Sequence, residues 1–257
     1  MAKGNDMKNM YLINLNKLEF VVTWACTGKC KHCSEGEHAL SGVHIDPDVA
    51  AKTVSAVAAC FPLQTVMTFG GEPLLYPDSV FAIHKAARDA GVKKRQVITN
   101  GYFTKDEKKM SAVVAALKEC GVNEILLSVD AFHQETIPLE PVKRFALAAK
   151  EANIPIYLQP AWLVSSEDDN PYNEKTWDVL KEFRALGLEE NDGNVIFPEG
   201  NASVYLKEYF QGEKPENPYV DDPMNLRCLS VDPDGTLLGE NLYQTEVEEI
   251  LKDYRPI

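Results

Sequence analysis

Short apolar runs and longer amphipathic stretches alternate along most of the chain. The runs have the length and composition of buried strands, and the stretches between them repeat apolar residues at helical spacing. The expected strands are residues 18–24, 64–69, 94–98, 123–129, 154–158 and 194–197. The expected helices are residues 48–60, 79–90, 105–119, 139–152 and 174–186. Each strand is thus followed by a helix until the pattern ends near residue 200.

This alternation of strands and helices is typical of strand–helix–strand units, in which successive strands run parallel. An open doubly wound sheet and a barrel both contain such units, but a complete eight-unit barrel needs about 250 residues. Six units that end near residue 200 favour an incomplete barrel. We therefore predict an α/β fold, a partial (β/α)6 barrel of the TIM type at residues 18–200, preceded by an N-terminal segment at 1–17.

Residues 201–257 differ from this pattern because glycine, proline and acidic residues interrupt them. Residues 228–238 alternate apolar and polar side chains about an Asp-Gly pair, which is typical of a β-hairpin. A short amphipathic stretch at 245–254 predicts a helix that packs against the barrel. We expect a C-terminal extension at 201–257 that consists of a short β-hairpin and a helix.

Composition and charge narrow the possible partners. The chain is 45% hydrophobic and 25% charged, as ordinary globular proteins are. Its formal net charge of −13 disfavours nucleic acid and anionic membrane surfaces as partners. No apolar run is long enough to span a membrane, and the N-terminus does not lead into a signal-peptide hydrophobic region. We expect a cytoplasmic protein that binds neither nucleic acid nor membrane.

Three of the six cysteines, Cys26, Cys30 and Cys33, lie close together after the first expected strand. Six cysteines are too few for a disulfide scaffold in a chain of this length, so this group indicates metal binding in a reducing compartment. Thiolates suit an iron–sulfur cluster or zinc. A structural zinc requires a fourth ligand, which His32 or His38 could supply. The spacing alone leaves both possibilities open.

Other polar motifs follow the carboxyl ends of the next three strands. They are Gly70-Gly71-Glu72-Pro73, Thr99-Asn100-Gly101 and the segment Ser128 to His133. In parallel α/β folds these ends share one rim, where binding sites form. We therefore expect the motifs to meet the cysteines in space.

The motif Cys26-x3-Cys30-x2-Cys33 after the first strand, together with Gly70-Gly-Glu-Pro73 after the second, resembles the radical S-adenosylmethionine superfamily. The resemblance implies one [4Fe-4S] cluster, which the three cysteines hold and whose open iron binds S-adenosylmethionine. It also implies reductive cleavage to a 5′-deoxyadenosyl radical that takes a hydrogen atom from a substrate. Such an enzyme is oxygen-sensitive.

The resemblance also implies roles for the rim residues. The turn Gly70, Gly71, Glu72 and Pro73 would bind the methionine amino group, and Asn100 would line the adenosyl site. Ser128 would contact the ribose or the methionine carboxylate. The alternative for Asn100 is an ordinary Asn-Gly turn, and for Ser128 a strand-end serine.

Three further rim residues have a structural alternative each. The resemblance places His32 near the adenine, although a plain loop histidine fits the sequence as well. Asp130 would lie at the adjoining rim, or cap a helix. His133 is a candidate catalytic residue, a proton donor or acceptor for the substrate, or another loop histidine.

The turn around Asn201 resembles a turn of the peptide-modifying branch, in which arginine usually stands at that position.

The hairpin that begins at Cys228 resembles the start of the SPASM or twitch extension, which carries auxiliary clusters in many relatives. No cysteine follows Cys228, and Cys60 and Cys120 stand at helix ends, where buried thiols are common. The extension is therefore expected to be degenerate and without a cluster.

The resemblance implies an electron donor such as flavodoxin or ferredoxin. The ancestry of the extension favours a peptide or protein side chain as substrate. A small metabolite is the alternative among enzymes, and a non-catalytic zinc or redox-sensing protein is the alternative outside them.

Overall fold

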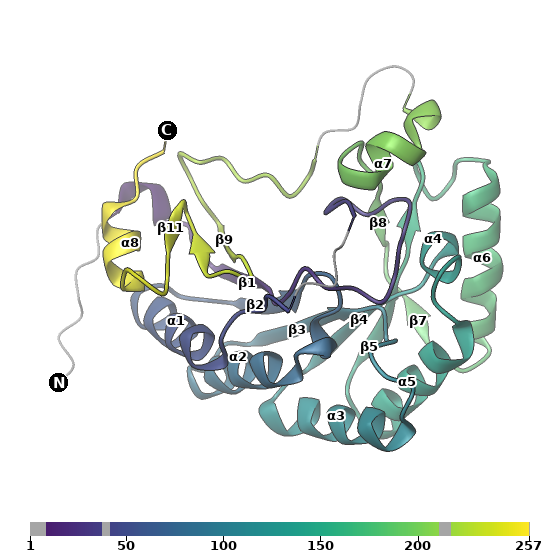
Figure 1. The fold of residues 1–257 in the computed structure, drawn as a ribbon, viewed down its shortest axis with the longest axis horizontal. Helices are drawn as coiled ribbons and strands as arrows, with labels where there is room; N and C mark the ends of the chain where they lie inside the picture. The colour runs from purple at the N-terminus through teal and green to yellow at the C-terminus, as the bar shows by residue number, and fades with distance from the viewer. Residues whose placement is uncertain (1–8, 38–41, 211–216, 257) are drawn as a thin grey trace.

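The computed structural model describes residues 9–37, 42–210 and 217–256. A curved sheet of seven parallel strands forms its centre, in the order β7-β5-β4-β3-β2-β1-β9, with helices along the outer side (Figure 1). The strands are β1 Lys17–Val21, β2 Thr65–Phe69, β3 Lys94–Thr99, β4 Glu124–Ser128, β5 Ile156–Gln159, β7 Glu189–Glu190 and β9 Cys228–Val231. The edge strands β7 and β9 do not pair with each other, so the barrel is partial and the predicted α/β class is confirmed.

The helices of the repeats also match the predicted segments. They are α1 Pro47–Cys60, α2 Pro77–Asp89, α3 Glu107–Cys120, α5 Leu139–Glu151 and α6 Pro171–Arg184, with shorter helices α4 Ala131–Gln134, α7 Gly200–Tyr205 and α8 Val247–Asp253. Local sequence explains their ends. The Asp106 side chain accepts the amide hydrogens of Lys108 and Lys109 at the start of α3, and Gly121 ends that helix at a φ of +100°. In the described ranges, no helix has the length and hydropathy that a membrane crossing requires.

Alternate residues of each strand face opposite sides of the sheet. Leu18 and Phe20 of β1 are fully buried in the main apolar core with the helices. Lys17 and Glu19 lie on the concave side and form an ion pair of 2.7 Å while partly exposed. The helices therefore stabilise the outer face, and the concave face stays partly polar.

The fifth and sixth strands are interrupted, which the apolar pattern did not predict. Pro160 separates β5 from the short β6, Ala161–Trp162, because it has no N–H for the ladder. The predicted strand at 194–197 is only β8, Asn194–Val195, which pairs with β6 in a separate two-stranded sheet. The strand that extends the main sheet beside β5 is β7, several residues earlier.

The C-terminal extension contains a hairpin and the predicted helix, but the hairpin is not the one predicted at 228–238 about Asp234-Gly235. The hairpin is formed by β10, Thr236–Leu237, and β11, Glu240–Asn241. The first part of the predicted hairpin is instead β9, which pairs parallel with β1 from Lys17↔Cys228 to Phe20↔Val231. The helix α8 lies within the predicted range 245–254. The last sheet strand of the chain thus lies beside the first.

Candidate functional site

The cysteines lie in a loop at the carboxyl end of β1, which we call the cysteine loop, residues 24–37. The turn after β2 is bound directly to it. The amide of Gly71 donates to the Thr23 carbonyl at 2.8 Å, and the amide of Glu72 donates to the Ala25 carbonyl at 2.8 Å. A Cβ on Gly71 would lie 2.1 Å from the Ala25 oxygen, so this position requires glycine. The two motifs that the sequence singled out therefore form one unit.

Cys30 is buried, Cys26 and Cys33 are partly buried, and the thiol of each has a raised pKa. Burial raises the pKa of Cys26 to about 12, and the charges of Glu72 and Cys33 add to the effect. Burial, Asp130 and Cys26 raise the pKa of Cys30, and burial raises that of Cys33. Thiolates that are buried together repel one another, so they need a cationic partner to ionise. An iron–sulfur cluster or a metal ion provides that charge.

The set of possible ligands distinguishes these two partners. Among the residues that the structure describes, one group of three or more potential ligands for a single metal ion is found: Cys30, His32 and His133, whose donor atoms lie within 4.8 Å of one another. The sulfurs of Cys26 and Cys33 are not part of this group. In a [4Fe-4S] cluster each cysteine binds a different iron. The residues present therefore fit the cluster. His38, the other proposed zinc ligand, lies outside the described residues.

Asn100 lies beside the first cysteine. Its Nδ2 donates to the Cys26 sulfur at 3.6 Å, and the Gly28 amide donates to the same sulfur at 3.3 Å. The Asn100 Oδ1 accepts the Tyr102 amide hydrogen at 2.8 Å, as in an Asx turn. Asn100 thus forms the ordinary turn and also lies beside a predicted cluster ligand, so the two alternatives for this residue do not exclude each other.

Glu72 is fully buried and joins the ends of β2 and β3. Its Oε1 accepts from the Leu74 amide at 3.0 Å and the Thr99 hydroxyl at 2.7 Å, and its Oε2 accepts from the Asn100 amide at 2.8 Å. Burial raises the pKa of Glu72 to about 7, although these donors and His133 act in the opposite direction. Thr99 had no assigned role in the sequence, although it belongs to the Thr-Asn-Gly motif.

Asp130 caps the short helix α4. Its Oδ1 accepts the amides of Phe132 and His133, each at 2.9 Å, and its Oδ2 accepts the Ala161 amide at 3.1 Å and contacts His133 Nδ1 at 2.7 Å. Burial raises the pKa of Asp130, but His133 and His32 outweigh this and lower it to about 2. Ser128 ends β4 opposite Gln159, and its side chain is partly exposed.

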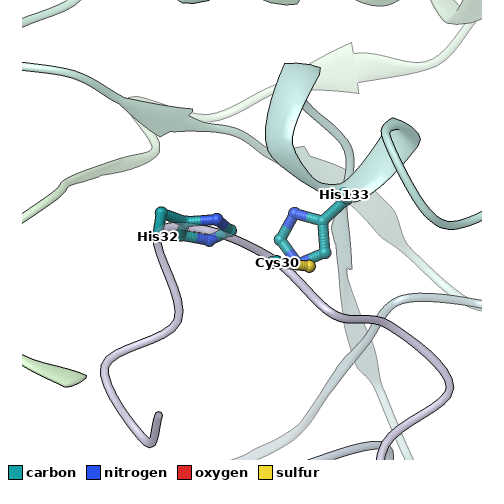
Figure 2. A group of neighbouring side chains, drawn as sticks. All are labelled: Cys30, His32 and His133. Carbon is teal, nitrogen blue, oxygen red and sulfur yellow. The ribbon is translucent and has the colours of Figure 1, made fainter. Parts of the chain in front are cut away.

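His32 lies between two aromatic neighbours. Its ring centre is 5.0 Å from that of Phe132 and 4.8 Å from that of His133. In Figure 2 the Cys30 sulfur lies beside the His133 ring, and the His32 ring lies to the left of both. Burial lowers the pKa of His32 to about 4, so the ring is neutral near pH 7, and its enclosed Nδ1 has no hydrogen-bond partner.

The helix α7 holds the cysteine loop from the side of β8. The Asn201 amide donates to the Cys33 carbonyl at 2.9 Å, and its Nδ2 donates to the Cys30 carbonyl at 3.0 Å. At Gly200 an added Cβ would lie 2.2 Å from the Ser34 oxygen. A role for Asn201 in holding the cysteine loop was not predicted, since nothing local shows that a turn after the sixth repeat contacts the first.

A second apolar cluster covers Cys30 where α7 meets the cysteine loop. Its buried members are Cys30, Phe132, Ala161, Leu163, Ile196, Ala202, Leu206 and Phe210. Such a cover keeps water away from the sulfur.

The other three cysteines lie near the opposite ends of the strands from the cysteine loop. Cys228 begins β9, and Cys60 and Cys120 end the helices that lead into β2 and β4. All three are therefore near the amino ends of strands, while the cysteine loop follows a carboxyl end.

Comparison with curated proteins finds distant relatives. The chain is 21% identical over 248 residues to GTP 3',8-cyclase of Moorella thermoacetica, which covers 95% of this chain and 64% of the relative. It is 28% identical over 134 residues to GTP 3',8-cyclase of Aquifex aeolicus, covering 49% of this chain and 38% of the relative. The chain thus spans less than two thirds of either relative.

Solved structures share the fold at low sequence identity. SuiB of Streptococcus suis bound to S-adenosylmethionine has a TM-score of 0.60 at 12% identity, over 93% of this chain and 66% of SuiB. BtrN in complex with AdoMet and 2-DOIA has a TM-score of 0.52 at 15% identity, over 93% of this chain and 82% of BtrN.

A family model covers most of the chain, including the cysteine loop and every rim motif described above. It is the model of the Radical SAM superfamily, and it matches residues 20–204. The prediction of an iron–sulfur enzyme with one [4Fe-4S] cluster and S-adenosylmethionine as cofactors is thereby confirmed. This chain belongs to the radical SAM superfamily.

Proposed function

We propose that this enzyme cleaves S-adenosylmethionine at a [4Fe-4S] cluster held by Cys26, Cys30 and Cys33, and that it removes a hydrogen atom from a substrate. The cluster, when bound, supplies the electron that converts S-adenosylmethionine into methionine and the 5′-deoxyadenosyl radical. The main support is the turn after β2, in which the Gly71 amide binds the Thr23 carbonyl and the Glu72 amide binds Ala25 of the cysteine loop. This contact brings the methionine-binding motif next to the cluster ligands.

Glu72 retains the capacity to bind the methionine amino group. An ionised carboxylate accepts about four hydrogen bonds. Three protein donors occupy Glu72, two on Oε1 and one on Oε2. We assign the remaining capacity of Oε2 to the ammonium group. The internal donors hold the carboxylate in place, so it loses little freedom when the cofactor binds.

The adenosine side is assigned to His32, Asn100 and Ser128. The partly exposed Ser128 offers a hydroxyl at the end of β4, and His32 offers an aromatic face and an unpaired nitrogen. Asp130 has four donors on its two oxygens, so we assign it to positioning His133 instead of contacting the cofactor. His133 remains the candidate proton donor or acceptor.

A peptide or protein side chain is the substrate class that we favour. The unpaired edges β7 and β9 leave the barrel open on one side, which admits a chain too large for a closed barrel. Two solved proteins of this fold carry peptides: SuiB bound to precursor peptide SuiA, with a TM-score of 0.57, and anSMEcpe with AdoMet and Cp18Cys peptide, with a TM-score of 0.55. Both are under 25% identical to this chain, so the argument rests on the open edge.

A small metabolite is the second candidate. The curated relatives are GTP 3',8-cyclases, and BtrN was solved with 2-DOIA. In either case the reducing electron comes from an external donor, for which we propose flavodoxin or ferredoxin, and we place the enzyme in the cytoplasm.

Anaerobic reconstitution tests the proposed chemistry. Protein supplied with iron and sulfide, then with dithionite and S-adenosylmethionine, should release 5′-deoxyadenosine. Cys30→Ala should release none, while the matched variant Cys228→Ala should remain active. Equal product from Cys30→Ala and the wild type would refute the site. A candidate peptide with deuterium at the reacting carbon should transfer its label to 5′-deoxyadenosine.

A further inference from the structure

Cys30, His32 and His133 offer one sulfur and two imidazole nitrogens around one point. Their donor atoms lie within 4.8 Å of one another, and the side chains come from the cysteine loop and from α4 (Figure 2). The sulfurs of Cys26 and Cys33 lie outside this group. The group therefore differs from the three-cysteine set that fits the cluster, although both contain Cys30.

His133 is oriented as metal-ligating histidines commonly are. Its Nδ1 lies 2.7 Å from Asp130 Oδ2, and the amides of Phe132, His133 and Ala161 fix that carboxylate. When Asp130 accepts a hydrogen bond from Nδ1–H, Nε2 is the ring nitrogen that is left with a lone pair to bind a metal. A carboxylate behind a histidine fixes the tautomer and strengthens the opposite nitrogen as a ligand.

His32 contributes an observation that independently indicates a ligand. Its Nδ1 is enclosed and has no hydrogen-bond partner. An unpaired buried nitrogen costs free energy that a bound ion would recover. The ring packs against Phe132 at 5.0 Å, which holds it beside Cys30 without a polar partner of its own.

We propose that the chain without its cluster binds one Zn²⁺ ion through Cys30, His32 and His133. One thiolate and two imidazoles are a donor set that zinc accepts, with a fourth position left for water. Binding transfers the Cys30 proton to solvent and involves no electron transfer. Because Cys30 cannot bind zinc and the cluster together, the zinc form and the active form exclude each other. Zinc would thus keep the cluster-free chain folded and inactive.

Metal titration of the cluster-free protein tests this site. Chelator-treated, reduced protein is titrated with Zn²⁺ by calorimetry and with Co²⁺ by absorption, which detects a thiolate ligand as a charge-transfer band. We expect one ion per chain. His32→Gln and His133→Gln should each weaken binding about tenfold or more. Cys30→Ser should abolish the Co²⁺ charge-transfer band.

Cys26→Ser and Cys33→Ser are the matched controls, because these residues bind the cluster and lie outside the proposed zinc group. Both should bind Zn²⁺ with an affinity close to that of the wild type. If they weaken binding as much as the histidine variants do, the ion sits among the three cysteines and the proposal is wrong. Absence of saturable binding in the wild type would overturn it too. Thermal unfolding without metal identifies any variant that has lost its fold. If one histidine variant has done so, the zinc affinity of the other histidine variant decides the question.

Cluster loading separates this proposal from the proposed function. Protein saturated with Zn²⁺ should take up no cluster until a chelator is added, and should then release 5′-deoxyadenosine under dithionite. Full cluster uptake with zinc still bound would refute mutual exclusion. Failure to form 5′-deoxyadenosine after zinc removal would count against the proposed function and leave the zinc result unaffected.

Discussion

The cysteine loop follows the carboxyl end of a strand, whereas Cys228 stands at the amino end of one. Iron analysis can measure whether each cysteine is needed to hold the cluster. Cys26→Ala should lose the iron because the remaining two thiolates leave a cluster corner without its ligand. Cys228→Ala should retain about four iron atoms per chain, since Cys228 stands at the amino end of β9, away from the cysteine loop. Iron and sulfide are measured after anaerobic reconstitution. Loss of iron from Cys228→Ala would indicate a second metal centre.

His84 gives the folded state a dependence on acidic pH. It lies fully buried, with Nε2 3.0 Å from the Thr68 hydroxyl, and burial and the Arg95 charge lower its pKa from 6.5 to about 3. Below pH 6.5 the unfolded chain takes up a proton that the folded chain does not, so stability falls as the pH falls towards 3. The slope approaches about 1.4 kcal/mol per pH unit.

The variant His84→Gln removes this titration and keeps an amide near Thr68. Between pH 7 and pH 5 the wild type should lose about 2 kcal/mol of unfolding free energy through His84. The variant should lose less over the same interval, whatever its stability at pH 7. Urea unfolding at both pH values measures the difference. Equal losses in the two proteins would show that His84 titrates normally.

Helix α7 provides a test of how neighbouring elements hold the cluster. Gly200→Ala places a methyl group against the Ser34 backbone at a φ of +49°, so α7 must shift and weaken the Asn201 contacts with the cysteine loop. We expect faster iron release to a chelator. Gly91→Ala is the matched control, because Gly91 also has a positive φ, +78°, but no atom lies within 4 Å of the added methyl group. Gly91→Ala should lose about 1 kcal/mol of stability because of its positive φ alone, and Gly200→Ala should lose more because its methyl group also meets the backbone of Ser34. Equal iron release from both would exclude α7 as a clamp.

The sequence predicts elements well where the cause is local. The capping side chain of Asp106 and the glycine at 121 define α3, and the cysteine spacing with Gly70-Gly71 identified the family. The strand with which a given strand pairs is not determined by its local sequence. The buried Leu229 and Val231 alternate with polar residues whether their strand joins a hairpin or the sheet.

The same limit applies to the group around Cys30. About a hundred residues separate His133 from Cys30, and the short helix that carries His133 is set by the Asp130 cap and the Ala161 amide together. A pattern along the chain shows each motif, but it does not show which nitrogen faces which sulfur. The contact of Asn201 with the cysteine loop was missed for the same reason.

The extension is part of the molecular core. Leu229 and Val231 of β9, and Val247, Ile250 and Leu251 of α8, belong to the main apolar cluster. The Asn9 side chain donates to the carbonyls of Leu251 and Tyr254 at 2.8 and 3.0 Å, which links the two ends of the described chain.

A chain that ends at residue 216 should therefore be unstable. It lacks β9, so one edge of β1 has unpaired backbone groups and the apolar cluster is open to water. We expect aggregation and loss of a cooperative melting transition. Size-exclusion chromatography and thermal unfolding of the truncated and full-length proteins measure this. A monomer that melts like the full chain would show that the barrel folds without the extension.

The position of β9 also affects how the protein is made. A ribosome releases β1 long before β9, the strand that covers its free edge. The cysteine loop follows β1 and depends on its carboxyl end, so its final shape has to await the synthesis of β9. Newly synthesised chains would thus expose an unpaired strand and three reactive thiols at once.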